Sequence, residues 1–317
     1  MIAKRGSGTQ AALGRSRVVR PTTIIEAPRL SARLGAKVIL ASETFQITGS
    51  FKFRAAFHLA SHVPEKLIIA ASSGNFGQAL ACACSMLGKA SIIVMPANSA
   101  KVKIDAVREY GGAVELVDVR VKSRSERLAE IAEQHPEAYV ASAYDDPFVI
   151  EGNASLGREI AALNYAFDSV VVPVGGGGLS AGIVKGISES GKRIAVIGSE
   201  PLLGNDAARS LRAGAVLANE AEPDTIADGA RTLKLGRLNW EILREGLEGI
   251  IEIGESEIEE GTRLLFELAN LKAEPTGALS IGALLCGPAR FRDRTVCCVI
   301  SGGNVDPAIY AKIISRA

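Results

Sequence analysis

The chain has 317 residues, of which 47% are hydrophobic and 22% charged, a composition typical of a soluble globular protein rather than a disordered one. Its 36 lysines and arginines are balanced by 35 aspartates and glutamates, which leaves a formal net charge of +1. This balance gives no electrostatic reason to expect a nucleic acid or an anionic membrane as a partner. No run of 18 uninterrupted apolar residues occurs, so we expect no transmembrane helix.

Short apolar runs alternate with longer amphipathic segments along the chain. The expected strands are 36–40, 67–71, 91–95, 113–116, 139–141, 169–174, 193–198 and 296–300. The expected helices are 53–62, 77–87, 99–110, 124–134, 179–190, 256–271 and 307–315. This alternation predicts an α/β fold in which mostly parallel sheets carry helices on both faces.

Two domains are expected from the same pattern. The run 67–141 holds several complete strand–helix units and is predicted to form a small domain. Residues 1–66 and 142–317 would form the large domain, and the polar stretch 142–153 would connect back to it. Ligands in such folds bind at the carboxyl ends of strands, so chemistry is expected in the strand-to-helix turns.

The cysteines indicate the compartment. There are five of them, without disulfide-like spacing, and Cys297 and Cys298 lie inside an apolar run. Free, buried cysteines are typical of a reducing environment, and the basic N-terminus lacks the apolar core of a secretory signal. We therefore expect a cytoplasmic protein.

Lys52 is the first candidate for chemistry. It follows a Gly-Ser turn within the stretch SETFQITGSFKFRAA and lies between Phe51 and Phe53. Aromatic neighbours would partly withdraw its ammonium from water, and desolvation lowers the pKa of a lysine and makes its amine a usable nucleophile. Taken alone, the stretch favours an ordinary exposed lysine at the start of a helix, and only the later motifs give Lys52 a chemical role.

Two strand-to-helix turns can hold anions. The first, Ser72-Ser73-Gly74-Asn75, leaves backbone N–H groups free at a helix start and suits a carboxylate, although an ordinary N-cap is an equal alternative. The second, Gly175-Gly176-Gly177-Gly178, lets the backbone approach a bulky anion closely, so a phosphate is the expected guest.

The glycine turn also supports a rival interpretation. Gly176, Gly178 and Ala181 match the dinucleotide fingerprint, and Glu200 ends the next predicted strand, where it would bind a ribose hydroxyl. The protein would then be an NAD-dependent oxidoreductase. That interpretation leaves Lys52 without a role.

Two further turns carry weaker signals. Glu200, Asp206 and the carbonyl of Gly204 offer oxygen ligands that suit Mg²⁺ or Ca²⁺, and a solvated acidic loop is an equal alternative. Ser301 follows the last predicted strand and would present a neutral hydroxyl at the sheet edge, although a simple turn would account for it as well.

Taken together, these segments resemble the fold-type II pyridoxal-phosphate enzymes, specifically the serine/threonine dehydratase and serine racemase family. The resemblance runs from about Pro21 to the C-terminus. Eight motifs in the family's order carry it: SETFQITGSFKFRAA, SSGNFGQALA, YDDPFVIEG, VPVGGGGLSAG, SEPLLGND, PDTIADGAR, AEPTGALSIGA and ISGGNVD. It implies the tryptophan synthase β-like fold, with two open, twisted, mostly parallel sheets, and a homodimer.

The resemblance also implies roles for the matching residues. Lys52 would form the Schiff base with pyridoxal 5′-phosphate and then act as the catalytic base. Asn75 would bond the phenolic oxygen of the cofactor, and Ser301 its pyridine nitrogen. The phosphate would bind to Gly175, Gly176, Gly177 and Gly178, with Phe51 and Leu179 as further cofactor contacts.

Other implied roles concern the substrate and a cation. Ser73 matches the serine that faces Cα from the side opposite the lysine in the racemases. The substrate carboxylate would bind to Ser72, Ser73, Gly74 and Asn75. The divalent-cation site of the racemase branch is matched by Glu200, Gly204 and Asp206.

The implied reaction is β-elimination. The cofactor acidifies Cα–H, and the neutral hydroxyl of Ser301 cannot keep the ring nitrogen protonated, which favours expulsion of a β-substituent over transamination. A β-hydroxy amino acid such as serine, threonine or 3-hydroxyaspartate would give a 2-oxo acid and ammonia. The alternatives are an amino-acid racemase, because Ser73 is present, and a ligand-binding protein of this fold without catalysis.

Departures from the family pattern concern the substrate. Gly152-Asn153-Ala154-Ser155 stands where Gly-Gln-Gly-Thr is common, and Phe76 stands where His is frequent. We interpret these as changes in the pocket lining, so threonine is not assumed. If Arg124 reached the cleft, its guanidinium would favour a substrate with a second carboxylate, such as 3-hydroxyaspartate; a solvated helix start is the alternative.

Overall fold

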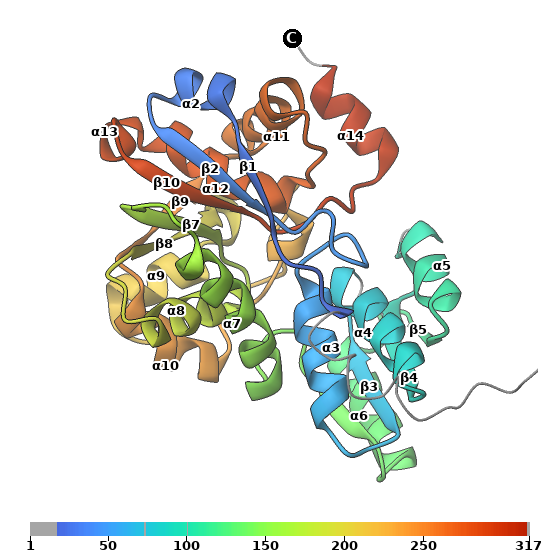
Figure 1. The fold of residues 1–317 in the computed structure, drawn as a ribbon. Coiled ribbons are helices and arrows are strands. Elements are labelled where there is room, and N and C mark those ends of the chain that lie inside the picture. The colour runs from blue at the N-terminus through green and yellow to red at the C-terminus, as the bar shows by residue number, and fades with distance from the viewer. Residues whose placement is uncertain (1–17, 73, 100, 316–317) are drawn as a thin grey trace, which may run out of the picture.

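The computed structural model describes residues 18–72, 74–99 and 101–315, and these residues form two sheets with helices packed on them (Figure 1). The six-stranded sheet has the order β1-β2-β10-β7-β8-β9. Its strands are β1 (Thr23–Glu26), β2 (Lys37–Ser42), β10 (Thr295–Ile300), β7 (Ser169–Pro173), β8 (Ala195–Pro201) and β9 (Gly249–Ile253). Only β1 pairs antiparallel, with β2, at one edge of this sheet.

The six-stranded sheet is covered on both faces. One face packs on α2 (Pro28–Leu34), α11 (Glu255–Ala269), α12 (Pro275–Cys286) and α13 (Pro288–Phe291). The other packs on α7 (Pro147–Ala162), α8 (Gly178–Glu189), α9 (Asp206–Ala213) and α10 (Arg237–Gly246). In β10, Cys298 belongs to the first core and Cys297 to the second. Because neighbouring residues of a strand point to opposite faces, these two thiols lie in different layers.

The four-stranded sheet has the order β5-β4-β3-β6 and is parallel throughout. Its strands are β5 (Ala113–Val117), β4 (Ala90–Pro96), β3 (Leu67–Ala71) and β6 (Tyr139–Ala141). One face packs on α3 (Lys52–His62), α4 (Asn75–Met86) and α5 (Lys101–Glu109), and the other on α6 (Arg124–Gln134). The remaining described elements are η1 (Leu202–Gly204), η2 (Asp228–Ala230) and α14 (Pro307–Ile314).

The predicted fold class is confirmed, since both sheets are mostly parallel and carry helices on both faces. All strands of the smaller sheet lie within 67–141, but α3, predicted to belong to the large domain, packs on this sheet. The division into 1–66 with 142–317 and 67–141 stays a prediction. Among the described residues, none of the helices has the length and apolarity that a membrane span requires.

The stretch 142–153, which is predicted to connect back to the large domain, contains the start of a helix. α7 begins within it, at Pro147, and Asp146 caps the helix by accepting hydrogen bonds from the backbone N–H groups of Phe148 at 2.8 Å and Val149 at 3.3 Å. Proline at the first helical position and aspartate at the N-cap favour a helix start here.

Candidate active site

Lys52 is the first residue of α3, which packs on the four-stranded sheet, and it follows a residue that is bonded to the end of the six-stranded sheet. Phe51, just before it, donates its backbone N–H to the carbonyl of Ser301 at 2.9 Å. The Nζ of Lys52 donates to the carbonyl of Ala143 at 2.9 Å. Burial lowers the pKa of Lys52 to about 8, against the opposing effect of the Glu274 carboxylate. A lysine with this pKa has far more neutral amine near neutral pH than an exposed lysine has, although the charged form still predominates.

The aromatic neighbours of Lys52 differ in part from those expected. Its Nζ lies 4.9 Å from the centre of the Phe51 ring and 5.8 Å from that of Phe76. Phe53 points instead into the core beneath the four-stranded sheet, where it is fully buried. Adjacent helical residues point about 100° apart, so Phe53 cannot share the direction of Lys52, and Phe76 of α4 takes that place.

The glycine turn lies between β7 and α8, as predicted. Gly177 has φ +91, a left-handed conformation that favours glycine. The Tyr144 ring fills the space where a Cβ on Gly176 would lie, and a Cβ on Gly178 would come within 2.8 Å of the Tyr144 carbonyl oxygen. Leu179 is buried in the core, so its backbone, not its side chain, is available to a ligand in the turn.

Ala143 and Tyr144 bring Lys52 and the glycine turn together. The Ala143 carbonyl accepts from the Nζ of Lys52, while the next residue, Tyr144, packs directly against Gly176 and Gly178. The Asn239 amide fixes this arrangement by donating to the carbonyls of Tyr144 at 3.0 Å and Gly176 at 2.7 Å. The amine and the anion-binding turn, 123 residues apart in sequence (52 to 175), are therefore held within one site.

Ser301 directly follows β10, and its hydroxyl is buried without a hydrogen-bond partner. The hydroxyl of nearby Ser50 is also buried and unpartnered. Ser50 forms a bridge with Gly302, which places both hydroxyls next to the backbone that carries Lys52. Buried polar groups normally have partners, so an unpartnered hydroxyl here indicates a place for a polar ligand atom.

Sequence reasoning missed Glu274, which is buried beside these groups. Its two carboxylate oxygens accept hydrogen bonds from the Asn75 amide at 2.9 and 3.1 Å. Burial, with Asp228, raises the pKa of Glu274 to about 8, against the effects of Asn75, Lys103 and Lys52. The only signal was its presence in the motif AEPTGALSIGA. It precedes a helix rather than following a strand, so the strand-end rule did not find it.

Asn75 begins α4 and is held from the other side as well. Asn304 donates to the Asn75 side-chain oxygen at 2.8 Å and to the Thr48 carbonyl at 2.7 Å. A Cβ on Gly49 would collide with the Asn304 side chain, and Gly49 has φ +72. The turn before Lys52 and the start of α4 are therefore connected through Asn304, which sequence reasoning also missed.

The predicted carboxylate-binding turn lies at the end of β3. The hydroxyl oxygen of Ser72 accepts from the backbone N–H of Gly77 at 3.1 Å, so it supports the turn rather than pointing freely outward. A Cβ on Gly74 would meet nothing within 4 Å, which leaves open space beside the backbone. Ser73, the predicted second catalytic residue, lies outside the described residues.

The predicted cation ligands lie near the end of β8 (Glu200), in η1 (Gly204) and at the start of α9 (Asp206), and the described residues contain no group of three His, Cys, Asp or Glu side chains that could hold a metal ion. Glu200 is already engaged. Its two oxygens accept from the backbone N–H groups of Ala207 at 3.0 Å and Ala208 at 2.8 Å, at the start of α9. Burial raises the pKa of Glu200 well above its usual range and that of Asp206 to about 6. One oxygen of Asp206 accepts from Asn219 at 2.8 Å, whereas its Oδ2 is buried without a partner.

Arg124 begins α6 and reaches toward the larger body. Its guanidinium lies 3.2 Å from Glu222, which belongs to the segment between α9 and η2. Burial, Asp145 and Asp206 raise the pKa of Tyr144, and the charge of Arg124 opposes them. Arg124 is therefore ion-paired with the larger body, and its reach into the cleft stays a prediction.

The segment Gly152-Asn153-Ala154-Ser155 does not line the pocket as its divergence suggests. It lies inside α7, where Asn153 donates to the Gly178 carbonyl at 3.0 Å and Ser155 accepts from Arg54 at 3.0 Å. These contacts lie behind the glycine turn and α3. The divergent residues are supporting residues, and they carry no direct information about the substrate.

Comparison with known proteins identifies the family. A family model described as pyridoxal-phosphate dependent enzyme matches residues 15–302. The L-threo-3-hydroxyaspartate ammonia-lyase of Pseudomonas sp is 34% identical, over 92% of this chain and 92% of that protein. Serine racemase of Schizosaccharomyces pombe is 31% identical, over 93% of this chain and 92% of that one. The solved structure of a T.th. threonine deaminase has a TM-score of 0.86 and 38% identity, over 92% of this chain and 95% of that chain.

This chain belongs to the pyridoxal-phosphate dependent enzymes, in the fold-type II serine/threonine dehydratase and serine racemase family. Membership overturns the NAD-dependent alternative and the non-enzymatic one. The structure gives a physical reason against the first, because Glu200 is 1% exposed and both its oxygens are bonded to α9. It is not available to a ribose.

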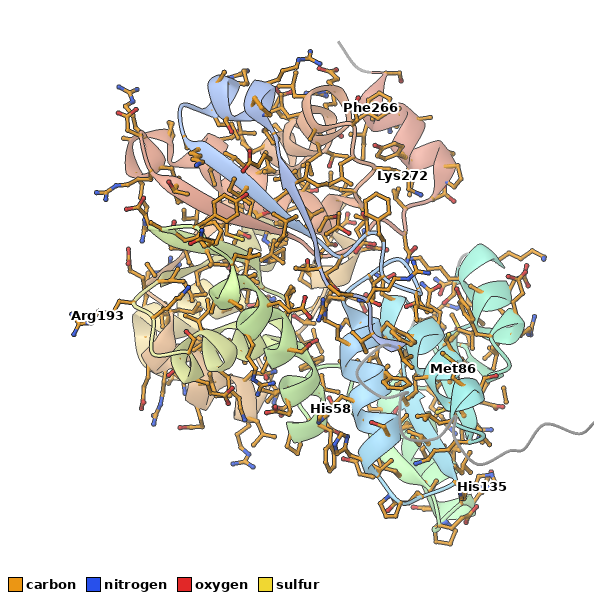
Figure 2. All side chains as sticks on the ribbon, viewed as in Figure 1. His58, Met86, His135, Arg193, Phe266 and Lys272 are labelled. Carbon is orange, nitrogen blue, oxygen red and sulfur yellow. The ribbon has the colours of Figure 1, made fainter. Side chains whose placement is uncertain are left out.

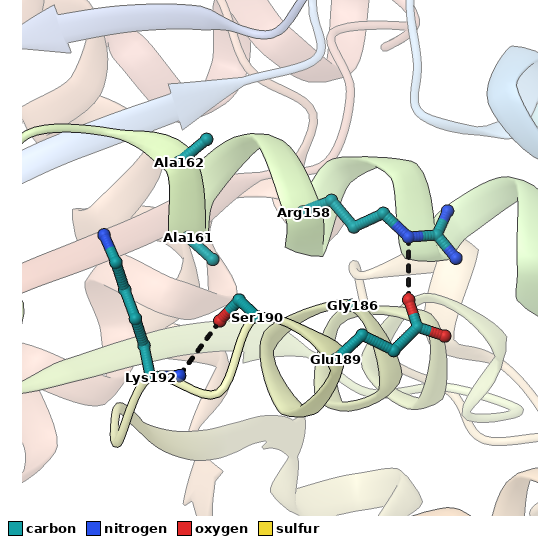
Figure 3. Close-up of a pocket in the computed structure, with 7 residues that line it drawn as sticks. All are labelled: Arg158, Ala161, Ala162, Gly186, Glu189, Ser190 and Lys192. Atoms are coloured by element: carbon teal, nitrogen blue, oxygen red, sulfur yellow. Dashed lines mark hydrogen bonds and ion pairs between the residues drawn. The ribbon is translucent and has the colours of Figure 1, made fainter.

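The residues present fit pyridoxal phosphate. Lys52 offers an amine with a lowered pKa, Gly175–Gly178 a backbone without side chains at a helix start, and Ser301 a buried hydroxyl without a partner. These three match the aldehyde, the phosphate and the ring nitrogen of the cofactor. A surface pocket of about 620 Å³ at the outer ends of α7 and α8 (Figure 3) has no such set of groups and lies at the opposite edge of the sheet.

Proposed function

We propose that the protein is an ammonia-lyase that removes water and then ammonia from a β-hydroxy amino acid, with pyridoxal phosphate held through Lys52. The observation that carries the proposal is the desolvated amine of Lys52, linked through Ala143 and Tyr144 to the glycine turn. When bound, the cofactor withdraws electrons from Cα of the amino acid and makes its proton acidic. The freed Nζ of Lys52 would take that proton.

The other residues would orient the reacting groups. The glycine turn would hold the phosphate with backbone N–H groups at the start of α8, and Asn75, fixed by Glu274 and Asn304, would hold the ring. Backbone N–H groups at Gly74 and Asn75 would hold the substrate carboxylate. Ser301 would give the ring nitrogen a neutral partner, which favours departure of the β-hydroxyl.

For the substrate we favour 3-hydroxyaspartate over serine and threonine. Arg124 supports this choice because its charge acts on Tyr144 beside the glycine turn, and a guanidinium pairs well with a second carboxylate. The relative from Pseudomonas sp, which is named for this substrate, supports it too. Racemase activity stays the alternative, and it depends on Ser73.

The deciding experiment is an assay of 2-oxo acid and ammonia with serine, threonine and each stereoisomer of 3-hydroxyaspartate, run beside a chiral assay of the amino acid that remains. We expect elimination, fastest with one isomer of 3-hydroxyaspartate. Inversion of configuration without 2-oxo acid would favour the racemase instead. Borohydride reduction of the loaded protein should leave a pyridoxyl phosphate group, which is the cofactor less one oxygen atom, on the peptide that contains Lys52.

A divalent cation at Glu200, Gly204 and Asp206 is a finer proposal. The unpartnered Oδ2 of Asp206 supports it, whereas Glu200 would have to share oxygens that already cap α9. Calorimetric titration with Mg²⁺ and Ca²⁺ tests it, and we expect binding that Asp206→Asn abolishes. An equal heat of binding in the variant would place the cation elsewhere. A homodimer and a cytoplasmic location likewise stay predictions, which light scattering and cell fractionation would test.

A further inference from the structure

The two halves of the site lie at the starts of two helices. Lys52 begins α3, and Gly178, the last residue of the glycine turn, begins α8. Figure 1 shows α7 between them. We propose that α7 sets the position of Lys52 relative to the glycine turn, and that Arg54 and Asn153 are positioning residues at its two contacts. This inference rests on the cofactor roles proposed above and not on the substrate.

Helix α7 lies very close to both neighbours. A Cβ on Gly152 of α7 would lie 2.7 Å from the Arg54 carbonyl oxygen and 2.9 Å from the Cβ of His58, and Figure 2 shows His58 on the side of α3 that faces α7. On the other side, a Cβ on Gly182 of α8 would lie 2.5 Å from the Cβ of Asn153. Such close backbone approaches leave little room for the helices to slide.

The contact with α3 is made by the Arg54 guanidinium, which is buried two residues after Lys52. It donates to both oxygens of Glu43 at 2.7 and 3.0 Å, and to both oxygens of Glu159 on α7 at 2.7 and 2.9 Å. Ser155 of α7 accepts from it at 3.0 Å. Bidentate pairs of this kind fix direction as well as distance, so the first turn of α3 is oriented by α7.

The contact with α8 is made by Asn153, which is 1% exposed. Its amide donates to the carbonyl of Gly178 at 3.0 Å, so it holds the last residue of the glycine turn. At the far ends of the two helices, Arg158 of α7 lies 2.7 Å from Glu189 of α8 (Figure 3). Helix α8 is thus fixed to α7 near both ends.

The positioning role makes a prediction that ordinary packing does not. Glu159 bonds to Arg54 of α3 and Asn153 bonds to Gly178 of α8, so each residue serves a different contact of α7. If α7 sets the spacing between Lys52 and the glycine turn, weakening one of its two contacts already lets Lys52 and the turn move relative to each other. Weakening the second contact then adds little. If each residue only stabilises the fold, the two effects multiply, as independent sites do.

The test is a double-mutant cycle on the full chain with Glu159→Gln and Asn153→Ala, measured as the dissociation constants of pyridoxal phosphate and of inorganic phosphate. Both substitutions leave the Arg54–Glu43 pair in place, which protects folding. Thr262→Val is the matched control, because it removes a buried hydrogen bond in α11, from the Thr262 hydroxyl to the Ile258 carbonyl, on the opposite face of the sheet.

We expect Glu159→Gln to weaken the binding of pyridoxal phosphate about fivefold, which is the effect of one lost hydrogen bond. The dissociation constant of inorganic phosphate should stay within twofold of the wild type, since phosphate alone needs only the glycine turn. Asn153→Ala should weaken both. In the double variant, the increase in the dissociation constant of pyridoxal phosphate should be at least threefold smaller than the product of the two single increases. Thr262→Val should lower the unfolding temperature and leave both dissociation constants within twofold of the wild type.

Two results would overturn the inference. One is a double variant whose loss of affinity equals the product of the single losses, and the other is a set of dissociation constants that follow the unfolding temperature in the two single variants and the Thr262→Val control. Cofactor affinity is measured without any substrate. Absence of elimination activity would therefore refute the proposed function and leave this result standing.

Discussion

The two sheets contribute to the site in different ways. At the six-stranded sheet, Ser301 follows β10 and the glycine turn follows β7, while Phe51 is bonded to Ser301 through the backbone. The four-stranded sheet brings the turn that begins with Ser72, and side-chain contacts join it to the larger body. These contacts include Asn75–Glu274, Lys103–Asp228 and Arg124–Glu222.

The difference teaches which part of the site can move. Ser301 and the glycine turn, which are expected to hold the ring nitrogen and the phosphate of the cofactor, follow strands that are paired within one sheet, and such a sheet opens only with the whole fold. Groups expected to hold the substrate are fixed partly by ion pairs whose side chains are partly exposed, and such pairs are weak. Substitutions on the two sides should therefore differ in kind: one set should abolish chemistry, and the other should alter substrate affinity.

The largest effect is expected on the cofactor side, from Lys52→Ala. Elimination should fall by at least about 10³-fold because the variant loses the base and the covalent attachment of the cofactor. The fold and the phosphate site should persist, so inorganic phosphate should still bind. The checks are the rate of 2-oxo acid formation and the loss of visible absorbance. Turnover retained in this variant would contradict the assignment of Lys52.

Arg124→Ala should have the next largest effect, and only on the substrate side. Loss of a charge-assisted contact should lower kcat/KM for 3-hydroxyaspartate by about 10- to 100-fold, mainly through KM. The value for serine should stay within about twofold, because serine lacks the second carboxylate. An equal loss for both substrates would show that Arg124 acts through the fold and not through recognition.

Glu274→Gln should shift a pH profile. The Glu274 carboxylate raises the pKa of Lys52, which burial lowers to about 8, so removing the charge should lower that pKa further. A lower pKa provides neutral amine at lower pH. Imine formation between pyridoxal phosphate and the cofactor-free protein should then begin at lower pH than in the wild type. A profile that stays in place or moves upward would show that Glu274 does not act on Lys52 through its charge.

The smallest effect is expected from Lys103→Ala, which breaks the ion pair with Asp228 between α5 and η2. Both side chains are partly exposed, at 29% and 38%, so the free energy of unfolding should change by less than about 1 kcal/mol. KM should rise by a few-fold at most while kcat stays unchanged. A large fall in kcat would place Lys103 among the reacting groups and would weaken the contrast between the two sheets.

The sequence predicted most of the parallel strands because strands buried on both faces read as unbroken apolar runs, as in β7 and β10. It missed β1 and β9, which lie at the two edges of the larger sheet and are only partly buried. It also missed α7, whose glycines and asparagine serve close helix packing and break the apolar pattern.

For the site, the strand-end rule found Ser301 and the glycine turn because position along a strand determines position at the sheet edge. It could not find Glu274 or Asn304, whose roles depend on contacts with Asn75 between segments far apart in sequence. Nor could it separate pocket residues from supporting ones: Asn153 and Ser155 differ from the family pattern, yet they lie inside α7.

The position of β10 has a consequence for the exchange of amide hydrogens with solvent. This strand lies between β2 and β7, inside the six-stranded sheet, and helices seal both of its faces. Its N–H groups should be among the slowest in the protein to exchange for deuterium, because their release requires global unfolding. Ser301 thus stands at the end of a strand whose backbone stays closed for as long as the protein is folded.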